Sequence, residues 1–180
     1  MIIIGIDPGL TGAVAVIFSS TNVAFFDAPT QKVKVGKSEK SELLPAEMAA
    51  YLRQVQRQGL CHCFIEKVTP MPDQGVTSMF NFGKGFGIWM GILAGLEIPH
   101  TFVTPQAWKK ALMQGVKDKD AARGRAQQLF PAATSQLSRK KDGGRADALL
   151  IAKYGLDSRQ IPTGRYGVVF HQGNGKSVLD

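Results

Sequence analysis

The sequence predicts one α/β domain, in which helices flank a mixed sheet of five strands. Three short strands follow one another at the start of the chain, and after them strands alternate with helical segments. With 180 residues, 44% hydrophobic and 20% charged, the chain also has the length and composition of an ordinary globular domain. We place this domain at residues 1–156 and a glycine-containing C-terminal tail at 157–180.

The first three strands are expected to form an antiparallel meander. Ile2–Ile6 is a continuous apolar run, which is typical of a strand buried on both faces. Tight turns lead to Ala13–Phe18 and then to Val23–Phe26, and such short connections require antiparallel neighbours. Residues 28–42 are polar and basic, so we expect a loop there.

Helices and two further strands, parallel to each other, are expected to fill the rest of the sheet. Pro45–Gln58 carries an apolar stripe at helical spacing, and Val76–Leu96 is apolar enough to be a helix despite its glycines. Cys61–Ile65 and Thr101–Val103 are the fourth and fifth strands. The other expected elements are helices at about 106–114, 118–130 and 145–154, and a basic loop at 138–145.

The charge of the chain points to a polyanionic partner. Lysine and arginine outnumber the acidic residues by 22 to 14, a net charge of +8. This excess favours nucleic acid first and an anionic membrane surface second. No apolar run reaches the roughly 18 residues that span a bilayer, and the N-terminal run lacks the basic start of a secretory signal. The absence of such segments also predicts no membrane association. Cys61 and Cys63 are too close on one strand for an easy disulfide, so we expect a reducing compartment.

Three acidic residues interrupt elements that are otherwise apolar. Asp7 and Glu66 end the first and fourth strands, and Asp147 lies near the start of the last helix. Burial of an unpaired carboxylate is costly, so three such residues indicate a bound cation. Asp142, in the basic loop, is the candidate for a fourth oxygen donor. Four carboxylates suit two Mg²⁺ ions, for which Mn²⁺ would substitute, and a metal held in this way indicates phosphate chemistry.

Each acid also has a structural alternative. Asp7 precedes Pro-Gly and would start a turn, and Glu66 would pair with Lys67 or another base. Asp147 would be a first-turn acid that the helix dipole favours, and Asp142 would be ordinary loop chemistry. Any one of Asp7, Glu66 and Asp147 could have such a structural role alone. It is much less expected that all three do.

The acids lie in three short motifs that follow one another over about residues 1–155. The motifs are Ile4-Gly5-Ile6-Asp7-Pro8-Gly9, Ile65-Glu66-Lys67 and the run from Asp142 to Ala152. Together they resemble the motifs of RuvC-type Holliday junction resolvases. Phe82–Gly91, the helix start Gln106–Lys109 and the last helix are most similar to the chloroplast and phage-like branch of that superfamily.

The resemblance implies an RNase H-like fold and a homodimer that binds four-way or otherwise branched DNA, without a nucleotide cofactor. It also implies Mg²⁺-dependent symmetric nicking of two strands of like polarity, which leaves 5′-phosphate and 3′-hydroxyl ends. The protein would act in the cytoplasm or nucleoid of a bacterial or phage host, or in an organelle, as a mature form, in a plant.

The same resemblance assigns roles to residues. Asp7, Glu66 and Asp147 would be metal ligands and catalytic residues, with Asp142 as the fourth. Lys109 would position or stabilise the scissile phosphate, unless its neighbour Lys110 does so. One departure concerns Gly144, because bacterial RuvC has an acid at this place, three residues before its last acid.

Basic and aromatic residues are the expected DNA contacts. Lys117, Lys119 and Arg123 would hold phosphates if they lie near the acids, although a solvated helix face explains them as well. Phe80 and Phe82 would stack at the junction centre, whereas Phe86, Trp89 and Leu93 have the spacing of a core or dimer helix. The other expected DNA contacts are Lys67, Lys84, Lys109, Lys110, Lys140, Lys141 and Arg145.

Three other functions are weighed against a junction resolvase. One is a nuclease of the same fold that acts on forks, flaps or RNA-containing branches, and another is a junction-binding protein with an impaired site, for which Gly144 argues. The third is an actin-like phosphotransferase, because Asp73–Ser78 imitates a phosphate motif of that class. That fold, however, needs two such domains and far more than 180 residues.

Overall fold

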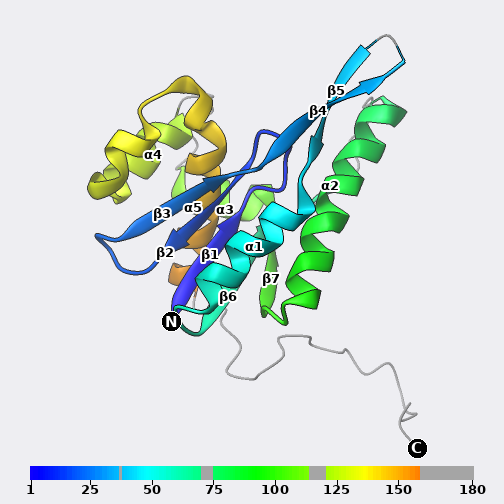
Figure 1. Ribbon diagram of the computed structural model, residues 1–180. Coiled ribbons are helices and arrows are strands. Elements are labelled where there is room, and N and C mark those ends of the chain that lie inside the picture. Colours follow the sequence, from blue (N-terminus) through cyan, green and yellow to red (C-terminus); the bar gives the residue numbers. More distant parts are fainter. Residues whose placement is uncertain (37, 70–74, 114–120, 159–180) are drawn as a thin grey trace, which may run out of the picture.

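The computed structural model describes residues 1–36, 38–69, 75–113 and 121–158. Its main sheet has five strands in the order β3-β2-β1-β6-β7 (Figure 1). They are β1 (Ile2–Ile6), β2 (Ala13–Ile17), β3 (Val23–Asp27), β6 (Cys61–Glu66) and β7 (His100–Val103). The first three form the antiparallel meander, while β6 is parallel to both β1 and β7. The predicted mixed sheet is confirmed.

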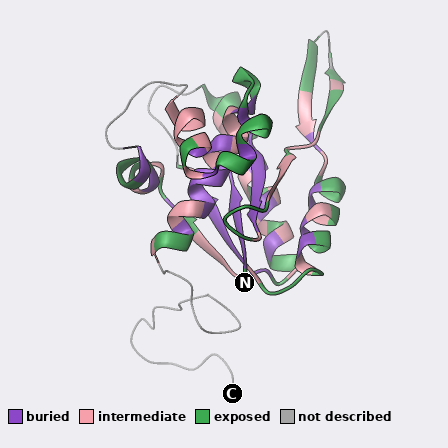
Figure 2. Cartoon of the chain, turned by 90° about the vertical axis from the view of Figure 1, so that its left-hand side faces the viewer, coloured by how far each residue is buried: buried purple, intermediate pink, exposed green. Residues whose placement is uncertain are grey.

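Helices cover both faces of this sheet (Figure 2). They are α1 (Pro45–Gln56), α2 (Val76–Gly95), α3 (Pro105–Leu112), α4 (Ala121–Leu129), α5 (Gly143–Ser158) and the short 3-10 helices η1 (Pro131–Leu137) and η2 (Lys140–Asp142). The helices α1 and α2 bury apolar side chains on one face of the sheet, and α3, α4 and α5 do so on the other. None of the helices described is long and apolar enough to cross a membrane.

The apolar run of β1 is explained by this two-sided packing. Ile3 belongs to the core beneath α5, whereas Ile4 and Ile6 belong to the core beneath α1 and α2. Alternating side chains of a central strand enter opposite cores, so every position of the strand is apolar. Trp89 and Leu93 of α2 are fully buried in the second core, which confirms their expected core role.

The helix α5 lies directly on β1 at Gly5. A Cβ atom at this position would be 2.1 Å from the carbonyl oxygen of Ala148 and 2.7 Å from the backbone nitrogen of Ala152. Only glycine allows such an approach of helix backbone to strand backbone. The contact places the first turns of α5 near the carboxyl end of β1.

Residues 28–42, predicted as a loop, instead form a hairpin of β4 (Thr30–Val35) and β5 (Ser38–Leu43). The hairpin projects beyond the main sheet beside α2 (Figure 1), so the prediction of a loop was wrong. A hairpin that extends away from the core needs no apolar face, and its polar composition concealed the strands. Opposed charges such as Lys34 and Glu39 are cross-strand partners, and Gly36 turns the chain with a φ of 63°.

The C-terminal part of the domain also differs from the prediction. The basic loop expected at 138–145 is wrong, because η2 occupies its middle and α5 begins at Gly143. The helix runs to Ser158, so the predicted boundary at 156 falls within it. The rest of the tail, together with Lys117, Lys119 and the start of the Asp73 motif, lies outside the described residues.

Candidate active site

Two acids lie together at the carboxyl ends of β1 and β6, because these two strands are adjacent and parallel. Ile6 is the register partner of Ile65, so Asp7 and Glu66, the next residues, lie side by side at the carboxyl ends of the strands. Asp7 also begins a tight turn, in which its Oδ1 accepts a hydrogen bond from the Gly9 amide at 3.2 Å. The turn-forming role and the site role of Asp7 are therefore compatible.

Asp147 joins these acids from α5. Burial and the neighbouring charges of Asp147 and Glu66 raise the pKa of Asp7 to about 7, although the Gly9 amide opposes the shift. Burial also raises the pKa of Asp147 to about 6, and the charge of Glu66 contributes. The three carboxyl groups are thus close enough to repel one another in a poorly solvated place.

Lys109 supplies positive charge to this group of acids. Its ammonium lowers the pKa of both Asp7 and Asp147, against the larger effect of burial. The residue lies in α3, which starts where Thr104 accepts a hydrogen bond from the Ala107 amide at 3.2 Å and Pro105 follows. This predicted site residue is therefore brought to the acids by the helix that follows β7.

Trp108 is a site residue that sequence reasoning missed. Its indole nitrogen donates a hydrogen bond of 2.8 Å to Oε1 of Glu66, and its side chain is only 1% exposed. The ammonium of Lys109 lies 5.1 Å from the centre of the same ring. A buried indole N–H often finds an acceptor, but no local sequence pattern indicates that Glu66, 42 residues away, is the acceptor here.

Asp142 is not grouped with the other three acids. Its carboxylate is 2% exposed and accepts hydrogen bonds from the Arg139 amide at 2.8 Å and from the Arg139 Nη2 at 2.8 Å. These bonds lower its pKa, and the charges that act on it are those of Arg139 and Arg145. The expectation that a loop carries this acid was wrong, because the bonds close the helical turn η2.

Close backbone packing explains why position 144 is a glycine and not an acid. A Cβ atom here would lie 2.4 Å from the carbonyl oxygen of Thr11 and 2.9 Å from Cα of Gly12. The start of α5 and the turn after β1 are in backbone contact at this point. Backbone therefore occupies the space that an acidic side chain at position 144 would need.

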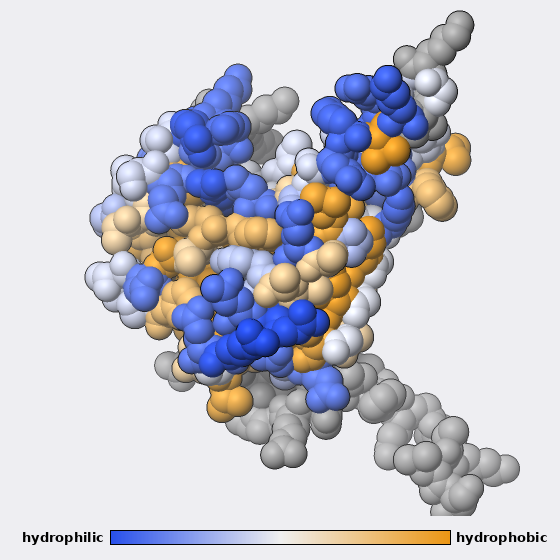
Figure 3. Space-filling model, in the orientation of Figure 1, coloured by the Kyte–Doolittle hydropathy of each residue, from blue (hydrophilic) through white to orange (hydrophobic). Residues whose placement is uncertain are grey.

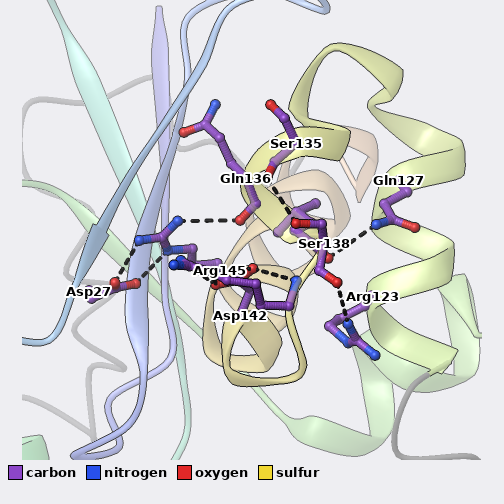
Figure 4. Close-up of polar contacts among 10 residues, drawn as sticks. Asp27, Arg123, Gln127, Ser135, Gln136, Ser138, Asp142 and Arg145 are labelled. Carbon is purple, nitrogen blue, oxygen red and sulfur yellow. Dashed lines mark hydrogen bonds and ion pairs between the residues drawn. The ribbon is translucent and has the colours of Figure 1, made fainter.

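Arg145, expected to contact DNA, is engaged by the protein itself (Figure 4). Its guanidinium binds both carboxylate oxygens of Asp27, at 2.5 and 2.6 Å, and donates to the Gln136 carbonyl at 3.3 Å. Lys84 likewise pairs with Glu42 of the hairpin at 3.1 Å, and Arg123 donates to the Ser138 carbonyl at 3.2 Å.

The remaining expected DNA contacts are mostly at the surface. Phe80 is 71% exposed, while Phe82 is partly buried. In Figure 3 hydrophilic side chains cover the hairpin and the region of α4, on the two sides of a notch in the upper outline of the molecule. Of the lysines expected to contact DNA in the described ranges, Lys67, Lys109, Lys110, Lys140 and Lys141 are exposed, as is the paired Lys84.

The carboxylates of Asp7, Glu66 and Asp147 are suitable ligands for a divalent metal, but their side chains do not surround a common point in this structure. Carboxylate oxygens are the ligands that Mg²⁺ prefers, and a cation would favour the charged forms of Asp7 and Asp147, whose pKa values are raised first by burial and then by neighbouring carboxylates. However, no group of three or more His, Cys, Asp or Glu side chains in the described ranges could hold an ion as it stands. The residue types fit, and ion binding would have to draw their side chains together.

The mixed five-stranded sheet and the helices that flank it are those of an RNase H-like fold. Among solved structures, the fold matches RuvC of Thermus thermophilus in complex with a Holliday junction substrate, with a TM-score of 0.58 and 14% identity over 88% of this chain and 96% of that one. RuvC of Thermus thermophilus in a second structure gives a TM-score of 0.52 at 17% identity, over 88% and 97% of the chains. At these identities the likeness concerns the fold.

The chain is also similar in sequence to a curated protein. Over 94 residues the chain is 35% identical to the chloroplastic Holliday junction resolvase MOC1 of Chlamydomonas reinhardtii. The match includes 52% of this chain but 11% of that protein, so the chain spans about a tenth of the relative's length. No protein-family model matches the chain. The resemblance to RuvC-type resolvases is confirmed by these comparisons.

Proposed function

We propose that this protein is a structure-specific DNA endonuclease that resolves four-way junctions. The observation that carries the proposal is the convergence of Asp7, Glu66 and Asp147, from two adjacent strands and α5, into one mutually repelling group beside Lys109. The RuvC-like fold and the similarity to a chloroplastic junction resolvase support the choice of substrate. The net charge of +8 supports a DNA partner.

In this proposal the three acids would hold Mg²⁺, or Mn²⁺ in its place, with two ions per site. Bound metal would supply activation of water and stabilisation of the leaving oxygen, so that symmetric nicks leave 5′-phosphate and 3′-hydroxyl ends. Lys109 offsets the charge of the acids and would hold the scissile phosphate close to them. The exposed lysines near the site would bind phosphates of the junction arms, and a homodimer would present two such sites.

Asp142 stays the fourth candidate ligand, although its bonds to Arg139 favour a scaffold role. This observation, together with the closed space at Gly144, favours a second candidate function. In it the domain binds junctions but cuts them slowly or not at all, because one acid of the bacterial pattern is missing.

Cleavage of defined substrates separates these functions. Immobile four-way junctions, forks and linear duplexes, labelled on each strand, are incubated with wild type and Asp7→Asn in Mg²⁺. The proposal predicts paired symmetric nicks in two like-polarity strands of the junction, lost in Asp7→Asn. Tight junction binding without cleavage by the wild type supports the second candidate, while preferential cutting of forks or flaps supports a nuclease with another branched substrate.

A further inference from the structure

The carboxylate of Glu66 has one hydrogen-bond partner among the described residues, and this partner is Trp108. The indole N–H bonds to Oε1 at 2.8 Å, which leaves Oε2 without a hydrogen-bond partner in the described part of the chain. One oxygen of the acid is therefore held by the protein, and the other is available to a ligand.

The donor itself is fixed. Trp108 is buried in the core cluster that also includes Phe64 of β6 and Val103 of β7. The Thr104 cap sets the start of α3, and Trp108 lies four residues further on, in the first turn. A partly buried acid at a strand end would otherwise rotate among several side-chain conformations, and a rigid donor removes this freedom.

The bond to Glu66 is not a general requirement of buried indoles in this protein. Trp89 is also fully buried, and its indole nitrogen has no hydrogen-bond partner among the described residues. Its packing in the opposite core tolerates an unpaired N–H. The pairing of Trp108 with a site acid thus calls for an explanation beyond packing.

We propose that Trp108 is a positioning residue that holds Glu66 through Oε1 and presents Oε2 to a divalent cation. The inference rests on the proposed function, since it requires Glu66 to be a metal ligand. Lys109, the next residue, acts on Asp7 and Asp147. The first turn of α3 would thereby control all three acids, one through a hydrogen bond and two through charge.

The indole signals in a ¹H–¹⁵N spectrum test this arrangement without any cleavage assay. The chain has two tryptophans, so Trp89→Phe assigns both signals. On titration of metal-free protein with Mg²⁺, we expect the Trp108 signal to shift and the Trp89 signal to stay. The shift should disappear in Glu66→Gln. The inference would be overturned if calorimetry shows Mg²⁺ binding that Asp7→Asn abolishes, but the Trp108 signal does not shift when Mg²⁺ is added.

A matched pair of substitutions gives the second readout. Trp108→Phe keeps an aromatic ring but removes the N–H, and we expect the Mg²⁺ dissociation constant to rise about tenfold, as for other residues that orient metal ligands. Trp89→Phe removes a similar volume from the other core and should leave it unchanged. A benzothienylalanine at position 108, which has the shape of tryptophan without the N–H, replaces Trp108→Phe if that variant does not fold.

The outcomes separate this inference from the proposed function. If wild type binds Mg²⁺ and neither change at position 108 weakens binding, Trp108 does not position a ligand, and the proposed function stands. If wild type neither binds divalent metal nor cuts junctions, both the proposed function and the inference are wrong.

Discussion

Arg145 and Asp27 form a two-bond ion pair that joins the first turn of α5 to the end of β3. Asp147 lies two residues beyond this pair in the same helix. Since Gly5 and Gly144 set how closely α5 approaches β1 and its turn, the ion pair adds a lateral restraint on the helix that carries a site acid.

This restraint gives the first prediction. Asp27→Asn should lower the free energy of unfolding by about 0.5–1 kcal/mol, because the pair has good geometry but Asp27 is largely exposed. Urea unfolding at low and high salt measures the change, which should shrink with salt. Duplex DNA binding should not increase. Stronger DNA binding in this variant would mean that the released Arg145 contacts DNA, and that the ion pair merely hides it.

Gly144 gives the second prediction. Gly144→Asp should not restore the acid of the bacterial pattern, because its Cβ would meet backbone at 2.4 Å. We expect destabilisation of about 2–4 kcal/mol and loss of cleavage. Gly143→Ala is the matched control, since a Cβ at that neighbouring position meets nothing within 4 Å, and stability should change by less than about 0.5 kcal/mol. A stable Gly144→Asp protein with faster cleavage contradicts the steric account.

Asp142 gives the third prediction. Asp142→Ala should reduce stability by about 1–2 kcal/mol, because it removes the bonds that close η2 onto Arg139. The Mg²⁺ dissociation constant of the variant should equal that of wild type, as measured by calorimetry on folded protein. A large loss of metal affinity without loss of stability would instead establish Asp142 as the fourth ligand.

The raised pKa of Asp7 predicts how metal-free stability depends on pH. A carboxyl with a folded-state pKa of about 7 binds protons more tightly in the native state than in the unfolded state. Its effect on stability is therefore most favourable at low pH and is lost as the pH rises through 7. Asp7→Asn in EDTA should be more stable than wild type at about pH 8, by roughly 1–3 kcal/mol, and this advantage should be clearly smaller near pH 5, because it vanishes only below the unfolded-state pKa of 3.8.

Urea unfolding curves at the two pH values, in EDTA and in Mg²⁺, measure this effect. Mg²⁺ should stabilise wild type at the higher pH and leave Asp7→Asn unchanged. Equal stability of the two metal-free proteins at both pH values would show that burial and the neighbouring acids do not raise the pKa of Asp7 as the structure indicates.

The sequence predicted the main sheet well because its signals are local. The apolar runs of β1 and β6, and the short turns between the first strands, specify both the strands and their direction. The same runs end in Asp7 and Glu66, so the edge of the sheet that holds the acids followed from the pattern. Asp147 could be predicted for a similar reason, as a charged residue in an apolar helix.

Other features could not be predicted because they depend on contacts distant in sequence. The bond from Trp108 to Glu66 spans 42 residues, and that from Arg145 to Asp27 spans 118. No local pattern reveals such a partner. Asp142 was misjudged for the opposite reason, since its polar surroundings indicate a loop until the bonds from Arg139 are known. The hairpin was missed because most residues of its strands are polar, so that the alternation of Val33 and Val35 with lysines in β4 is a weak signal.

The central claim is that Asp7, Glu66 and Asp147 form a divalent-metal centre. Crystals of the protein soaked in Mn²⁺, with data collected to give its anomalous signal, test this most directly. We predict anomalous density in contact with all three carboxylates, with Trp108 still bonded to Glu66 and Asp142 still bonded to Arg139. Mn²⁺ density elsewhere and none at these three acids would contradict the account.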